Sequence, residues 1–248
     1  MLLRSLSQHL RAQNWTAVCL DLLIVVVGIF LGLQVSQWYE RQQEIGLEAS
    51  ILERLREEFE TISAEADSAV RVHQEEIVAL ELIKQFLKAG SLDPDDEPRF
   101  REGLLGAMNY ELGPSRSGTY IEILSSGQFR LLGNQDLRSA LSSYDDLVLK
   151  GDSLFSIFQQ NQRKYETVFN RYFERGPSQK RDFDSMPTGI VFLHGEIDEM
   201  DFDAMASDEQ FLDAIGRLIE YHINFQFWHG KISQSADRVL DLLEADDS

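Results

Sequence analysis

A twenty-residue apolar run near the N-terminus constrains this chain more than any other feature of its sequence. Residues 16–35 read T-A-V-C-L-D-L-L-I-V-V-V-G-I-F-L-G-L-Q-V, with one acid, one glutamine and no basic residue. As a helix the run covers about 30 Å, which is the hydrocarbon thickness of a bilayer. Trp15 precedes it and Trp38 and Tyr39 follow it. Because such aromatic residues are enriched at membrane interfaces, we interpret them as interfacial anchors of a transmembrane helix over 15–39.

The apolar run fits an uncleaved anchor better than a secretory signal. A signal has about 7–15 apolar residues followed by small residues at a cleavage site. This run is longer, and no Ala-x-Ala sequence follows it. Arg4 and Arg11 precede the run, and basic residues favour the cytoplasmic side. We therefore expect a bacterial inner-membrane protein with a short cytoplasmic amphipathic segment (1–14) and a periplasmic domain (40–248).

The charge and cysteine content narrow the class of protein further. The 248 residues carry a formal net charge of −19, whereas a nucleic-acid-binding domain presents a basic face. We therefore expect no nucleic-acid partner. The single cysteine, Cys19, lies inside the apolar run, so no disulfide can form within the chain. A periplasmic domain must then be held together by packing alone.

The first half of the chain after the run has the pattern of helices. Apolar residues recur at three and four spacings from Leu47 to Leu80, with His73 among them, and Gly90 is a suitable residue to end that long helix. Asp93 and Pro94 predict the start of a second helix that reaches about Asn109. A short helix is expected over 119–125 and a turn over 129–132.

The second half predicts two more long helices. Asn134 is a good N-cap for a helix that ends near Gly176, with a kink or break at Gly151. The pattern is lost over 177–206, which predicts an irregular insertion. Ser207 and Gln210 form a capping box for the last helix. No sustained strand alternation appears, so we predict an all-α fold, in which one N-terminal transmembrane helix continues into an antiparallel bundle.

Two segments resemble a family of bacterial single-pass membrane proteins described as a domain of unknown function. The run D-L-L-I-V-V-V-G-I-F-L-G-L-Q-V-S-Q-W-Y-E (21–40) is similar to that family's acidic residue followed by L-V-V-I-G-I-L-I-A-L-Q-I-N-N-W-N-E. The segment 120–134 resembles its L-x-S-S-G-x-L-x-L-I-x-N sequence. Asp21 replaces the usual Glu, Gly32 replaces Ala, and Tyr39 replaces Asn. The resemblance implies an inner-membrane anchor with a helical outer domain, and it brings no catalytic residues.

Polar and small residues within the anchor are candidates for contact with a partner helix. Asp21, Gly28 and Gly32 are spaced by seven and four, which places them on one helical face. A G-x-x-x-G spacing lets two helices approach closely, and Gln34 is placed to hydrogen-bond across such a pair. Asp21 has two interpretations, a partner or ion-path carboxylate and a carboxylate that reaches interfacial water. We expect a homo-oligomer or a complex with another membrane protein.

A polar corner in the outer domain is a second candidate site. Its residues surround a predicted short helix and a glycine turn: Arg116, Tyr120, Glu122, Gln128 and Arg130. Such a corner is suited to a small ligand. The alternative is a structural corner in which Leu124, Phe129 and Leu132 close the end of the bundle.

No motif in the sequence predicts a reaction, a metal or a cofactor. His222 and His229 share a helical face, but zinc ligands converge from closer spacings or with a third ligand, so we interpret both as core residues. We predict no metal site, no catalytic residue and no cofactor. The expected function is a non-enzymatic scaffold or accessory subunit in the membrane. The alternatives are a ligand-sensing module that signals through a partner and an ion-path subunit that uses Asp21.

Overall fold

The computed structural model describes residues 15–108, 114, 116–169, 171–176 and 196–246. The all-α fold expected from the sequence is confirmed, and two short antiparallel strands are added to it. The predicted segment 1–14 and most of the predicted insertion at 177–206 lie outside the described residues. The elements are α2 (Trp15–Ala89), α3 (Glu97–Gly106), α4 (Gly118–Ser125), η1 (Gln128–Leu131), α5 (Gln135–Phe169), β1 (Phe173–Arg175), β2 (Ile197–Met200), α6 (Phe202–Ser207) and α7 (Glu209–Asp246).

The chain divides into two compact units, Met1–Ile51 and Leu52–Ser248. The described part of the first unit consists of the N-terminal residues of α2. They belong to a helix that is long and apolar enough to cross a membrane. The apolar part of that helix is not buried. Since a core segment would be mostly buried, this apolar stretch is not part of the core of the described chain.

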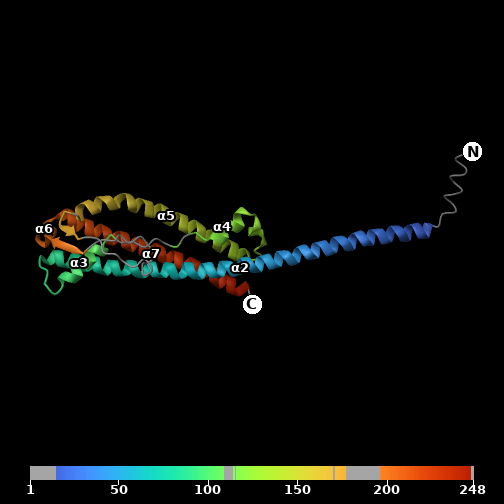
Figure 1. The fold of residues 1–248 in the computed structure, drawn as a ribbon, viewed down its shortest axis with the longest axis horizontal. Coiled ribbons are helices and arrows are strands. Elements are labelled where there is room, and N and C mark those ends of the chain that lie inside the picture. Colours follow the sequence, from blue (N-terminus) through green and yellow to red (C-terminus); the bar gives the residue numbers. More distant parts are fainter. Residues whose placement is uncertain (1–14, 109–113, 115, 170, 177–195, 247–248) are drawn as a thin grey trace, which may run out of the picture. The chain divides into compact units, whose positions relative to one another are not determined.

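The second unit is a bundle of the three predicted long helices. In Figure 1, α5 and α7 lie beside the later part of α2, with α3 and α6 at one end of the bundle and α4 at the other. Ring contacts fix the directions: Phe59 on α2 meets Tyr144 early in α5, and Phe169 late in α5 meets Phe211 early in α7. The last helix is therefore antiparallel to α5, while α5 runs in the same direction as α2.

Helix α3 explains how α2 and α5 come to run in the same direction. It packs back along α2 through two glycines, because a Cβ on Gly103 would meet Ile83 at 2.9 Å and one on Gly106 would meet the Glu76 carboxylate at 2.6 Å. The chain thus turns back at Gly90, so that α3 runs opposite to α2.

Helix α3 starts later than the sequence predicted. Asp93 does not cap a helix; its side chain accepts a bond from the Asp95 N–H, and the chain makes a turn over 93–96. Asp96 is the N-cap residue, and Pro98 lies in the first turn. The sequence has two prolines, Pro94 and Pro98, that could each lie in the first turn of a helix, and the helix begins at the second.

Several predicted helix ends are confirmed. Gly90 follows α2 with φ +67°, and its N–H bonds to the Phe86 carbonyl at 3.1 Å. Ser117 accepts from the Tyr120 N–H at 3.0 Å at the start of α4, and Asn134 accepts from the N–H groups of Asp136 and Leu137 before α5. These ends were predictable because each cap is a local hydrogen bond between residues two to four positions apart.

Two predicted features are corrected by the structure. The predicted Ser207 cap lies at the end of α6, and Asp208 caps α7 by accepting from the Gln210 N–H at 2.8 Å. Gly151 does not break α5, which continues through it. Instead, a Cβ at Gly151 would collide with the Trp228 indole of α7. The glycine therefore permits the close packing of α7 on α5.

The core follows the predicted apolar stripes. Residues of α2 at intervals of three and four are buried, and the large cluster near the α3–α6 end joins α2, α3, α5, α6 and α7. The fully buried large side chains include Leu55, Phe59, Leu80, Ile83, Phe100, Leu104, Tyr144, Phe158, Phe169 and Phe211.

Candidate functional site

The apolar stretch of α2 is exposed along its whole described length. Side chains from Leu20 to Val35 are 46–64% exposed, which is unusual because soluble proteins rarely leave a large continuous apolar surface in water. Trp38 and Tyr39, the predicted anchors at one end, are 61% and 60% exposed. This surface therefore requires lipid or another protein to cover it.

The small residues of this stretch face open space. A Cβ at Gly28 or Gly32 would meet nothing within 4 Å, and Gln34 is exposed as well. Asp21 lies in the same helix and at the predicted register, whereas its side chain and that of Trp15 are outside the described residues. The surface predicted for a partner helix is thus available on Gly28, Gly32 and Gln34.

The predicted ligand corner around α4 is filled by a carboxylate of the protein itself. Glu58 on α2 accepts from the Ser117 hydroxyl at 2.8 Å and from the N–H groups of Gly118 and Thr119 at 2.6 and 3.1 Å. The N-terminus of a helix attracts anions because its first N–H groups lack partners within the helix. In this fold the Glu58 carboxylate is that anion. The sequence did not reveal this contact, because Glu58 lies about sixty positions before the start of α4.

The charged residues of the corner are also engaged within the bundle. Arg116 forms a two-pronged ion pair with Asp145 of α5 at 2.5 and 2.8 Å. Glu122 pairs with Arg54 of α2, and this bond raises the pKa of Arg54 and lowers the pKa of Glu122. These contacts join α4 and the chain before it to α2 and α5.

The other corner residues contribute mainly to packing. Tyr120 is buried, its hydroxyl lies 3.2 Å from the Ser142 hydroxyl, and its ring meets Phe129 edge-on. Gln128 and Arg130 lie on η1. Leu132 is fully buried, whereas Leu124 is 50% exposed. The contacts of Arg116, Tyr120 and Glu122 thus favour the structural interpretation of this corner.

Three histidines meet in the centre of the bundle. His73 of α2 and His222 and His229 of α7 are 0%, 1% and 3% exposed. The Nδ1 atoms of His73 and His222 lie 3.0 Å apart, and the rings of His73 and His229 stack in parallel at 5.3 Å. Sequence reasoning placed His222 and His229 in the core but did not bring His73 to them. The sequence did indicate that His73 is buried, because it lies among the regularly spaced apolar residues of α2.

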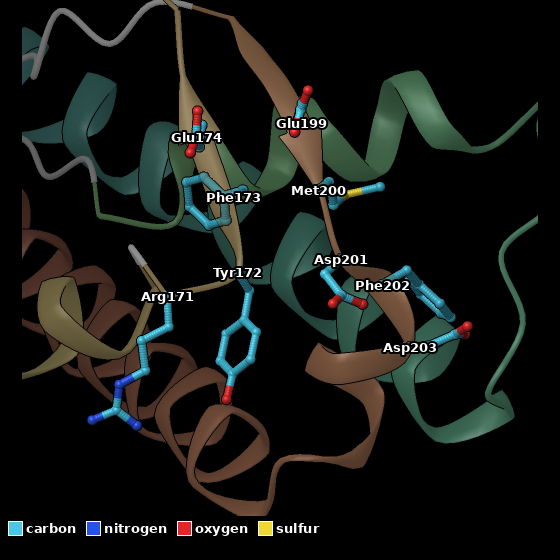
Figure 2. Close-up of a pocket in the computed structure, with 9 residues that line it drawn as sticks. All are labelled: Arg171, Tyr172, Phe173, Glu174, Glu199, Met200, Asp201, Phe202 and Asp203. Atoms are coloured by element: carbon cyan, nitrogen blue, oxygen red, sulfur yellow. The ribbon is translucent and has the colours of Figure 1, made fainter.

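A pocket at the α3–α6 end of the bundle is lined by the paired strands β1 and β2 and by the residues that flank them. Figure 2 shows its lining from Arg171 to Glu174 on one side and from Glu199 to Asp203 on the other. Glu174 and Glu199 are directly opposed across the strand pair. The hydroxyl of Tyr172 bonds to Asp208, which lowers the pKa of that carboxyl and raises the pKa of Tyr172.

The described residues contain no group of three or more His, Cys, Asp or Glu side chains placed to hold a metal ion. Together, the elements define an all-α bundle preceded by one exposed apolar helix. A comparison of the chain with protein-family models, curated proteins and solved structures found no match.

Proposed function

We propose that this chain is a non-enzymatic, single-pass protein of the bacterial inner membrane that acts as a scaffold or accessory subunit. Residues 1–14 would lie in the cytoplasm and residues 40–248 in the periplasm. The observation that carries the proposal is the exposure of every described apolar side chain from Leu20 to Val35 in a helix long enough to span a bilayer.

The partner surface in this proposal is the face of Gly28, Gly32 and Asp21. Association within a membrane depends on close packing and on hydrogen bonds between helices, and small residues permit both. Gly28 and Gly32 leave room for a neighbouring backbone, since nothing of the described chain lies within 4 Å of a Cβ at either position. The partner is a second copy of this chain or another membrane protein.

The test compares what co-purifies with variants of the full chain. Two differently tagged copies are expressed together, extracted in mild detergent and captured by one tag, and the other tag and all co-purifying proteins are quantified. We expect Gly28→Leu with Gly32→Leu to lower recovery of the partner by about tenfold or more, because leucine side chains hold the helices apart.

Two substitutions serve as matched controls. Gly46→Leu makes the same change at an equally open position of α2 beyond the apolar run. Phe30→Leu places a leucine inside the run on the opposite face. Both should leave recovery of the partner unchanged. Equal recovery from the double glycine variant and the wild type would remove the glycine face from the proposal, and a chain that purifies alone as a monomer would contradict the scaffold function.

A further inference from the structure

The hydrogen bonds of the buried histidines define where their protons lie. His222 Nε2 is 3.3 Å from the carbonyl oxygen of Ala107, and a carbonyl only accepts, so Nε2 carries the hydrogen. Neutral His222 then has its lone pair on Nδ1. The 3.0 Å contact between the two Nδ1 atoms requires His73 to donate its Nδ1–H to that lone pair. Both rings are neutral in this arrangement.

A second proton on His222 does not fit this arrangement. A proton on Nδ1 of His222 would face the Nδ1–H of His73 across 3.0 Å, so the two rings cannot both be charged without separating. The ring of His229 lies against His73 at 5.3 Å and brings a third titratable group to the same place. An imidazolium here would also lose its hydration, because the three side chains are at most 3% exposed.

The described elements packed on the histidines contribute a carbonyl, aromatic rings and a few charged residues. Helix α3 contributes the Ala107 carbonyl, and α5 contributes Phe155 and Phe158, which pack on Phe225 beside the histidines. The charged groups of α2 around His73 are Arg71 and Glu75, which are exposed, Glu76, which is half-buried, and Asp67, which accepts from the Ser233 hydroxyl of α7 at 2.7 Å.

The acidic groups nearby in the sequence of α2 do not change this conclusion. Burial, followed by the charges of Glu75 and Glu102, raises the pKa of Glu76 to about 7. Glu76 is therefore neutralised in mild acid. Burial lowers the pKa of His222 to about 4, partly opposed by its bond to Ala107. Below its ordinary pKa, His222 thus takes up a proton more readily when the bundle is open.

We propose that His73, His222 and His229 form an acid-sensitive joint, at which proton uptake below about pH 6 weakens the packing of α7 on α2. The neighbouring contacts between the same two helices, Gln74 with Gln226 at 2.6 Å and Asp67 with Ser233, would weaken with it. The bundle would then respond to the acidity of its surroundings without any bound ligand.

The experiment follows unfolding of the full chain in detergent by urea at pH values from 7.5 to 4. Trp15→Phe and Trp38→Phe are introduced so that the fluorescence reports from Trp228, which is adjacent to His229. His222→Gln keeps a side-chain N–H for the Ala107 carbonyl but cannot be charged. His194→Gln is the control for a histidine outside the described residues.

We expect the unfolding equilibrium constant of the parent chain to rise about 150-fold more between pH 7.5 and pH 4 than that of His222→Gln. His194→Gln should behave as the parent. If His222→Gln does not fold, His222→Phe, which retains an aromatic ring but takes up no proton, should show the same loss of pH dependence. Equal pH dependence in the parent and the folded variants would overturn the proposal. So would a zinc-induced rise of the unfolding midpoint at pH 7.5 that EDTA reverses and His222→Gln abolishes, because the cluster would then be a metal site.

Discussion

Glu76 is the carboxyl whose ionisation the fold opposes most clearly. Its pKa is raised to about 7 by burial first and by Glu75 and Glu102 next. Because the folded-state pKa lies above the unfolded value, the stabilising contribution is complete below about pH 4.5 and is lost as the pH rises through 7. The direction is opposite to that of His222, which loses stability as the pH falls.

Glu76→Gln should therefore stabilise the bundle in alkali. We expect the free energy of unfolding to rise by about 1–3 kcal/mol at pH 8 and to change little at pH 5. Urea midpoints at the two pH values measure this difference. Glu60→Gln, at an exposed acid of the same helix, is the control. Equal gains from both substitutions, or a gain at pH 5 as large as at pH 8, would contradict the buried-carboxyl explanation.

Single residues were predictable from the sequence when their environment is local. The burial of His222 and His229 followed from the apolar spacing of their own helix, and it is confirmed. Their contact with His73 was not predictable, because it joins positions 149 residues apart and depends on the register of α7 against α2. The same holds for Asp145, which completes the ion pair of Arg116 from another helix.

At the scale of elements, α4 is held on α2 by Glu58. Its carboxylate receives three hydrogen bonds from the first residues of α4 and its cap, Ser117, Gly118 and Thr119. Glu58→Ala removes all three acceptor contacts, so the free energy of unfolding should fall by about 1–2 kcal/mol. Hydrogen exchange of the α4 amides (118–125) should accelerate more than exchange in α5.

Glu57→Ala is the matched control, because Glu57 is an exposed acid of the same helix. If the α4 amides exchange equally fast in both variants, Glu58 does not hold α4 in place. Rescue of the Glu58→Ala defect by added inorganic phosphate would show instead that the corner accepts an external anion.

Whole elements were predicted better than their limits and their partners. The three long helices and α4 follow from apolar spacing and local caps. The pairing of β1 with β2 was missed, because each strand has only three or four residues and no alternation long enough to detect. The continuity of α5 at Gly151 depends on Trp228 of another helix, which no local rule supplies.

At the scale of the whole molecule, the exposed apolar stretch should decide solubility. We expect a chain that begins at Gln43 to remain monomeric without detergent and to keep the thermal midpoint that the full chain has in detergent. The compact unit Leu52–Ser248 contains the buried core, while the exposed apolar residues from Leu20 to Val35 belong to the other unit. Sedimentation and circular dichroism measure both properties.

The full chain without detergent provides the comparison. It should aggregate or associate with membranes that alkaline carbonate does not strip. If the full chain were soluble and monomeric in plain buffer, the proposed membrane span would be wrong. If the shorter chain unfolded or precipitated, residues before Gln43 would have to contribute to the stability of the bundle.

The opposed carboxylates of Glu174 and Glu199 make the pairing of β1 with β2 sensitive to the salt concentration. Like charges facing each other across a strand pair repel, and mobile ions reduce that repulsion as their concentration rises. The apolar core has no such dependence on screening. In a chain with a net charge of −19, the ionic strength of the solution therefore affects how firmly β1 and β2 are joined.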